Sequence, residues 1–148
     1  MNFTANDIFI MNEPLEFIKQ RPKMFLRNIS GVELAMAVVA GACLMTEKPV
    51  TVRHKEPWWL VGSEMDWLGS QPGVSIQDFF SRIIPFPEAG PNSMRGEILL
   101  AAFAADIVVH GKPDTCVVKG KVLPTDEIWH FIRTNPEWLR VVAFRMGA

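Results

Sequence analysis

The chain has 148 residues, of which 49% are hydrophobic and 21% charged, and its formal net charge is −1. This length suits a single hydrophobic core, so we expect one domain over residues 1–148. The apolar content excludes an intrinsically disordered chain. The balanced charge, without a run of Lys or Arg, argues against nucleic acid or an anionic membrane surface as a partner.

Three features bear on the cellular compartment. The N-terminus has no basic start and includes Asp7 and Glu13, so it does not have the pattern of a signal peptide. The longest apolar run, 34–45, is shorter than the roughly 20 residues of a membrane span. Cys43 and Cys116 lie in apolar runs, which favours buried free thiols over a disulfide. We therefore expect a cytoplasmic protein.

The first third of the chain predicts two helices. Pro14 suits the first turn of a short helix, which should end before Pro22 because the residue before a proline disfavours the helical conformation. Ser30 and Glu33 have the spacing of a capping box. The helix that follows, about 32–45, is apolar on nearly all sides, which is typical of a helix buried on most of its surface.

The middle of the chain predicts a β-hairpin and a short helix. The runs 50–54 and 58–62 read as strands, and the turn residues 55–57 between them indicate a hairpin. Ser75 and Asp78 fit the capped start of an amphipathic helix that ends before Pro85.

The last third predicts three helices and one strand. The apolar run from about Met94 to Val109 reads as a helix capped at Asn92 or Ser93. A third strand, 115–123, should bend at Gly120, and helices over about 126–133 and 135–144 end the chain. The predicted fold class is α+β: a small, mostly antiparallel sheet of about three strands packed on two apolar helices, with short helices at both ends.

The segment 15–26 (LEFIKQRPKMFL) resembles the opening of the ATPase domain of DNA gyrase B and its relatives. In that family a short helix leads into Arg-Pro-Gly-Met-Tyr-Ile-Gly, and Arg21, Pro22, Met24 and Phe25 match it in type. The resemblance would imply ATP binding. It covers about a dozen residues of the 148.

The residues that such an ATPase needs do not follow. Lys23 and Arg27 stand where the family has glycines, and the next helix offers Glu33 but no asparagine for magnesium. The segment 66–69 (DWLG) has the wrong spacing for the adenine-binding loop, and no P-loop is present. We therefore expect neither ATP binding nor another cofactor.

The layout also resembles the immunity proteins of bacterial polymorphic-toxin systems. Short bacterial proteins of this kind open with the same Arg-Pro-x-Met-Tyr/Phe segment and carry tryptophans further along the chain. The resemblance implies a bacterial protein that binds and blocks a protein partner and catalyses no reaction.

A tryptophan-rich stretch is the first candidate recognition segment. Trp58 and Trp59 are neighbours on a predicted strand and face opposite sides, so one packs in the core. The other lies either in a second apolar layer or on the surface, where it would be a candidate interface anchor. Glu64 and Asp66 would share one face of an extended segment, where they could bind a cation, an arginine or a polar ligand. The same residues, with Trp67, could instead fill the core and leave the carboxylates in solvated loops.

The loop 87–95 is the second candidate recognition segment. Its prolines would hold polar side chains and the free amides of a helix start in one place, as in an anion or partner site. Arg95, in the predicted first turn, opposes the helix dipole, which indicates an acidic partner among Glu88, Glu64 and Asp66. An ordinary capped helix with one surface arginine would explain the same residues.

Catalytic and metal sites have no support in the sequence. His54, His110 and His130 are far apart and have no metal-ligand spacing with another His or Cys, and Ser63 lacks the Gly-x-Ser-x-Gly setting of a nucleophile elbow. The function that we expect is binding of a protein partner, such as a toxin. The predicted partner-binding residues are Trp58, Trp59, Glu64, Asp66, Trp67, Glu88 and Arg95.

Two other functions stay open. The first is an enzyme or small-ligand binder with a pocket built from Glu64, Asp66, Glu88 and Arg95. The second is a structural subunit that associates with copies of itself.

Overall fold

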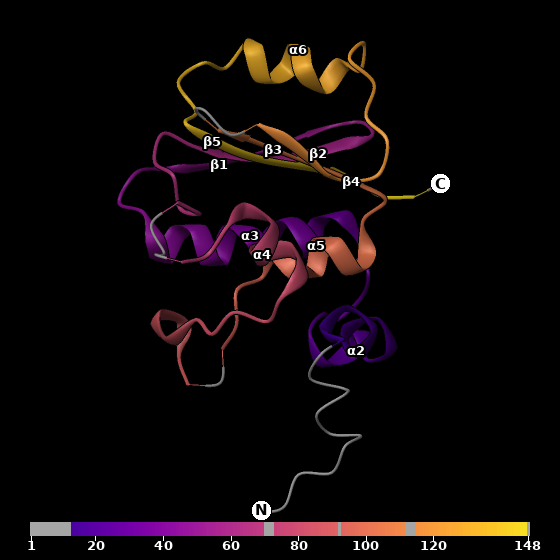
Figure 1. The fold of residues 1–148 in the computed structure, drawn as a ribbon. Coiled ribbons are helices and arrows are strands. Elements are labelled where there is room, and N and C mark those ends of the chain that lie inside the picture. Colours follow the sequence, from indigo (N-terminus) through magenta and orange to yellow (C-terminus); the bar gives the residue numbers. More distant parts are fainter. Residues whose placement is uncertain (1–12, 70–72, 92, 112–114, 148) are drawn as a thin grey trace, which may run out of the picture.

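The computed structural model describes residues 13–69, 73–91, 93–111 and 115–147. It has an α+β fold around a five-stranded antiparallel sheet (Figure 1). The sheet order is β1-β2-β5-β3-β4, with β1 at Val50–Lys55, β2 at Trp58–Ser63, β3 at Asp106–Gly111, β4 at Cys116–Lys119 and β5 at Arg140–Arg145. The predicted fold class and hairpin are confirmed, but the sheet has five strands where about three were predicted.

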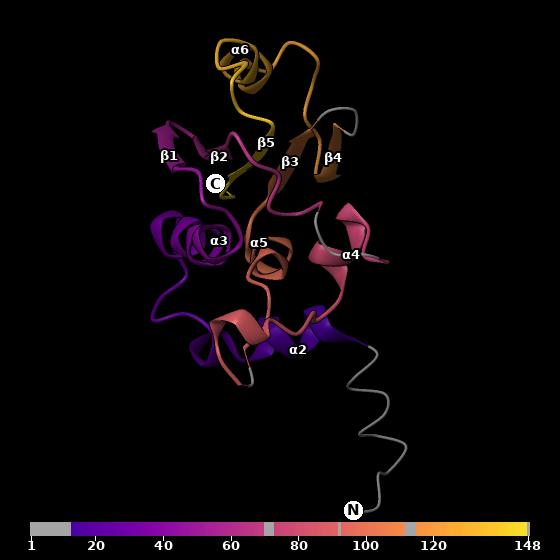
Figure 2. The ribbon, with the colours of Figure 1, turned by 90° about the vertical axis from the view of Figure 1, so that its left-hand side faces the viewer.

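Helices cover both faces of the sheet (Figures 1 and 2). One face carries α3 (Gly31–Met45), α4 (Ile76–Ser81) and α5 (Glu97–Phe103), with α2 (Pro14–Gln20) in the layer beyond them. The other face carries α6 (Glu127–Arg133). The chain also has two 3₁₀ turns: η1 (Pro22–Met24) follows α2, and η2 (Pro87–Ala89) precedes α5. Within the described ranges no helix is long and apolar enough to cross a membrane. The N-terminal residues behind the signal-peptide prediction lie, apart from Glu13, outside those ranges.

The burial of the central strand β5 explains why the sequence did not indicate that this segment is a strand. Val142 and Phe144 face the core under α3 and α5, and Val141 and Ala143 face the core under α6. A strand buried on both faces reads as a continuous apolar run and cannot be told from a helix by periodicity. The helix predicted over 135–144 is therefore wrong, and β5 takes its place.

The helix predicted over 94–109 begins later and ends earlier than predicted. Helix α5 begins at Glu97 with Gly96 at its N-cap and no capping side chain, and it has seven residues. Its predicted cap at Ser93 is therefore wrong, and Asn92 lies outside the described residues. From Asp106 onward the predicted span belongs to β3, because the β-branched run 107–109 favours the extended conformation.

Helix α3 is buried on one side only, not on most of its surface as predicted. Leu34 and Val38 face the core and are fully buried. On the opposite side Val32 and Met36 are half-exposed, and Cys43 is an exposed free thiol where a buried one was predicted. This helix therefore presents an apolar side to solvent.

Candidate functional site

The three predicted tryptophans lie in different parts of the interior. Trp58 is buried under α6, where its indole Nε1 donates a hydrogen bond to Asp126 at 3.0 Å. Trp59 faces the other side of the sheet, is half-buried and stacks on His54 with ring centroids 3.8 Å apart. Trp67 is 1% exposed. Trp58 and Trp67 therefore fill the cores, and Trp59 keeps partial contact with solvent.

The predicted carboxylate pair is divided as well. The two oxygens of Asp66 accept hydrogen bonds from Arg140 at 2.8 and 2.7 Å, and one of them also accepts the backbone N–H groups of Leu68 and Gly69. Burial by itself raises the pKa of Asp66, but these hydrogen bonds and the Arg140 charge bring it below its ordinary value. Glu64 is exposed and takes no part in this arrangement.

Arg95 lies in the core, before α5, and not in the first turn of a helix. Its side chain is 1% exposed, with Nε 3.2 Å and Nη2 3.0 Å from Glu97 Oε1. Nη2 also donates to the carbonyl of Trp67 at 3.3 Å. The guanidinium lies 4.9 Å from the ring centroids of both Phe79 and Phe86, close enough for cation–π attraction. Two predicted site residues, Arg95 and Trp67, are thus brought together, inside the fold.

Glu97 is the acidic partner of Arg95, in place of Glu64, Asp66 or Glu88. It is fully buried, and its Oε2 accepts no hydrogen bond from the described residues. Burial raises the pKa of Glu97, and the Arg95 charge and hydrogen bond only partly offset this. The sequence analysis missed this residue. The sequence did contain a signal for this pair, because Arg95 and Glu97 have opposite charges and are two residues apart in an otherwise apolar run.

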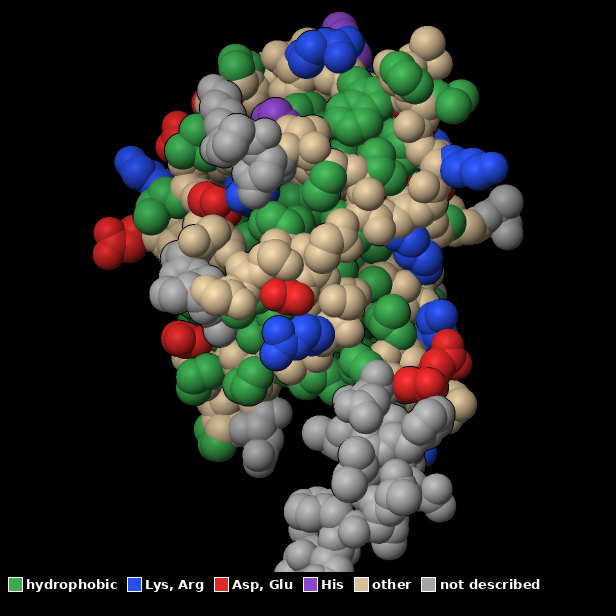
Figure 3. Space-filling model, in the orientation of Figure 1, with side chains coloured by type: hydrophobic (Ala, Val, Ile, Leu, Met, Phe, Trp, Pro, Cys, Tyr) green, Lys and Arg blue, Asp and Glu red, His purple; other side chains and the backbone are tan. Residues whose placement is uncertain are grey.

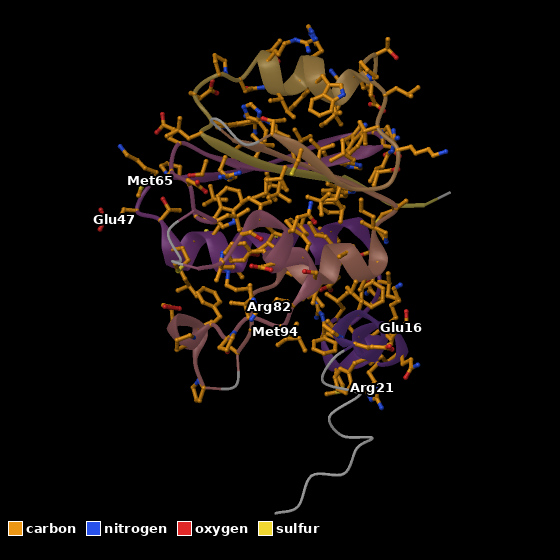
Figure 4. The ribbon with its side chains drawn as sticks, viewed as in Figure 1. Glu16, Arg21, Glu47, Met65, Arg82 and Met94 are labelled. Atoms are coloured by element: carbon orange, nitrogen blue, oxygen red, sulfur yellow. The ribbon has the colours of Figure 1, made fainter. Side chains whose placement is uncertain are left out.

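A cleft of about 390 Å³ lies beside α3. Its walls come from η1, from α3 and from the segment between η2 and α5, where Figure 4 shows Met94 on the side of α3 away from the sheet. The lining residues are Met24, Phe25, Ala37, Ala40, Gly41, Leu44, Phe86, Ala89, Ser93, Met94, Gly96 and Leu99. The loop that was predicted as a recognition segment thus borders the cleft, but through Ala89, Ser93 and Met94.

Close backbone packing holds the cleft in shape. A Cβ atom on Gly96 would lie 2.8 Å from the carbonyl oxygen of Ala37, so glycine lets this segment approach α3. The segment is closed on itself, because Phe86 donates its backbone N–H to the carbonyl of Ser93 at 2.9 Å. The η2 wall is therefore an ordered turn held against the helix.

The cleft offers contact with apolar groups. Among the described residues that line it, none is ionisable, and Ser93 supplies a hydroxyl. Lys23 on η1 and Glu88 on η2 are exposed and are chain neighbours of the lining residues Met24 and Ala89, so these two segments carry opposite charges. Figure 3, which shows one face of the molecule, has apolar side chains interspersed with both signs of charge. Within the described residues, no three His, Cys, Asp or Glu side chains are grouped to hold a metal ion.

Comparisons of the chain with protein-family models, with curated proteins and with solved structures found no match. The functional assignment therefore depends on the geometry of the cleft and of the surfaces around it.

Proposed function

We propose that this protein is a non-catalytic binding protein that recognises another protein, and that the partner inserts an apolar side chain into the cleft beside α3. The observation that carries the proposal is the lining of the cleft, in which every described residue except Ser93 is apolar or glycine. Protein interfaces gain most of their affinity from a few apolar anchors in such recesses, because burial there removes apolar surface from water.

The rims of the cleft favour a protein over a small molecule. Met24 forms part of the η1 wall and is 65% exposed, so the wall projects into solvent and does not close over a ligand. Lys23 and Glu88, the exposed chain neighbours of the lining residues Met24 and Ala89, could pair with charges beside the inserted side chain, which would set the orientation of the partner.

The resemblance of the opening segment to immunity proteins makes a toxin the partner class to test first. Such a toxin would meet this protein in the cytoplasm. The predicted partner-binding residues other than Trp59, Glu64 and Glu88 would then act indirectly. Arg95 supports the wall that carries Phe86, while Trp58, Trp67 and Asp66 hold the sheet and the turn after it.

A small apolar ligand is the second candidate function. The volume of the cleft, about 390 Å³, falls in the range of about 300–1,000 Å³ that ligand sites occupy. The four residues from which a ligand pocket was predicted, Glu64, Asp66, Glu88 and Arg95, are absent from the lining of this cleft.

The variant Met24→Glu tests the proposal, with Leu123→Glu as a matched control. Both methionine and leucine side chains are 65% exposed, so both changes add a charge at equal exposure, but only Met24 lines the cleft. Immobilised wild-type and variant chains are incubated with extracts and with secreted toxins of the source cells. Proteins retained by the wild type and by Leu123→Glu, but lost with Met24→Glu, are purified and titrated by calorimetry.

We expect Met24→Glu to weaken the Kd of such a partner at least about tenfold, because a carboxylate would be desolvated against apolar surface. A partner that binds both variants equally would contradict the proposal. An apolar small molecule that raises the melting temperature of the wild type, but not of Met24→Glu, would assign the cleft to the second function.

A further inference from the structure

The solvent-facing side of α3 carries an apolar stripe that the cleft does not use. In α3, Val32, Met36, Val39 and Cys43 recur at intervals of four, three and four residues, and Ile29, which lies just before the helix, continues this spacing. Ile29, Val32 and Met36 are 49%, 53% and 51% exposed, Cys43 is exposed and Val39 is half-buried. This is the spacing of the a and d positions along which two helices pack against each other. We call these five residues the α3 seam.

The edge of the sheet lies next to the α3 seam. Figure 2 shows β1 as the outermost strand on one side of the molecule, with α3 beneath it on that same side. In the described part of the chain, β2 is the only strand paired with β1, so its outer edge is open. An open strand edge favours pairing with another strand, and an exposed apolar helix favours burial. An occupant of this side has to satisfy both.

We propose that a second copy of this chain covers the α3 seam, related to the first by a twofold axis perpendicular to α3. Such an axis keeps the two sheets on the same side of the two helices. It therefore brings α3 antiparallel to its copy and β1 antiparallel beside its copy in a single arrangement. A second copy has both elements in the required relative positions by symmetry, whereas an unrelated partner would need to reproduce them.

The spacing within the α3 seam fits antiparallel packing. If Met36 lies opposite Val39 of the second copy, Val32 lies opposite Cys43, so an a position meets a d position in every layer. Ala40, beside the seam, is small and exposed, and so lets the two helices approach closely.

The charges at the two ends of α3 support the same orientation. Arg27 lies before the helix and is exposed, with Glu33 3.4 Å from its Nε, and Glu47 is exposed just after the helix. Figure 4 shows Glu47 at the opposite end of α3 from α2 and Arg21. Antiparallel packing places Arg27 near Glu47 of the second copy and aligns the helix dipoles favourably, whereas parallel packing would bring the two Glu47 side chains together.

The mass of the full chain in solution tests the proposal. Light scattering at about 100 µM should report about twice 16.7 kDa for the wild type. Met36→Glu should report a single chain with an unchanged circular dichroism spectrum, because its carboxylate would be buried in the seam. Leu123→Glu and the cleft variant Met24→Glu should remain dimeric, which separates this surface from the one in the proposed function. A wild-type mass of one chain, or a Met36→Glu mass of two, would overturn the proposal.

Cross-linking tests the orientation. In a chain with Cys116→Ser and Val32→Cys, oxidation should join position 32 of one copy to Cys43 of the other, which peptide mass spectrometry identifies. Links from 32 to 32 and from 43 to 43 would indicate parallel packing and overturn the proposed axis. A chain with Cys116→Ser and Leu123→Cys should give no link between positions 123 and 43, and such a link in the same yield as the one from 32 to 43 would overturn the proposal.

Discussion

Two arginine–carboxylate pairs in this protein have the same chemistry and opposite electrostatic outcomes. Arg140 and Asp66 join the sheet to the turn after β2, and Arg95 and Glu97 join the start of α5 to the aromatic core. The pKa of Asp66 lies below its ordinary value, and the pKa of Glu97 lies above its own.

The difference comes from the number of donors and from contact with water. Asp66 accepts hydrogen bonds from two Arg140 nitrogens and from two backbone N–H groups, and its side chain is 36% exposed. Among the described residues, side chains donate hydrogen bonds to Glu97 at Oε1 alone, and Glu97 is 0% exposed. For Asp66, pairing and hydrogen bonding therefore lower the pKa by more than burial raises it. For Glu97, burial raises the pKa by more than pairing lowers it.

The largest effect should come from removing the buried arginine. Arg95→Met leaves the Glu97 carboxylate buried without its cation, which should lower the free energy of unfolding by about 3–5 kcal/mol. Urea unfolding at pH 7 measures this change. The double variant with Arg95→Met and Glu97→Leu should recover most of the loss, because no buried charge is left. A double variant as unstable as the single one would show that Arg95 acts through packing on Phe79 and Phe86.

Removing the charge of the more exposed pair should cost less. Asp66→Asn should lower the free energy of unfolding by about 1.5–3 kcal/mol at pH 7, the range for hydrogen bonds to charged groups. Because the pKa of Asp66 is lowered from 3.8, its stabilising contribution is present above that pH and is lost as the pH falls through the folded-state pKa. The difference in free energy of unfolding between the wild type and Asp66→Asn should therefore become smaller in urea titrations below about pH 4.

The backbone beside the buried pair can be disturbed without changing a charge. Gly96→Ala would place a Cβ against the carbonyl of Ala37 and should cost about 1–2 kcal/mol, as overpacking does. Gly41→Ala is the matched control on the other wall of the cleft, because its Cβ would lie 3.5 Å from Phe86, an ordinary contact. Thermal unfolding should show Gly96→Ala melting below Gly41→Ala, and the reverse order would contradict the packing described here.

The smallest effect at neutral pH should come from Glu97→Gln, within about 1 kcal/mol, because the amide retains an acceptor for Arg95 and removes a charge that is costly to bury. The pKa of Glu97 is raised from 4.5, so its contribution to stability is present below that pH and is lost as the pH rises through the folded-state pKa. In urea unfolding from pH 4 to 8, the free energy of unfolding of Glu97→Gln should rise relative to that of the wild type as the pH increases. For Asp66→Asn the relative change should have the opposite sign. Equal slopes for both variants would mean that the two carboxylates have similar environments.

Local signals predicted the elements whose ends are set by neighbouring residues. Pro22 ends α2, Ser30 accepts the backbone N–H of Glu33 at the start of α3, and Ser75 and Asp78 form the predicted capping box of α4. The hairpin of β1 and β2 was predicted because apolar and polar residues alternate over 50–54, and because turn residues that include a proline separate this run from a second strand-like run at 58–62. Each of these features depends on groups within a few residues of one another, so the sequence alone contains the information.

The sequence by itself determined the class of the fold, its first helices and its hairpin. The tertiary structure alone decided that 140–145 is the central strand, that Arg95 pairs with Glu97 inside the core, and that one side of the apolar helix α3 faces water. The physical reason is that an apolar run records only that a segment is buried. The number of its faces that are covered, and the layer that covers each, depend on residues distant in the chain.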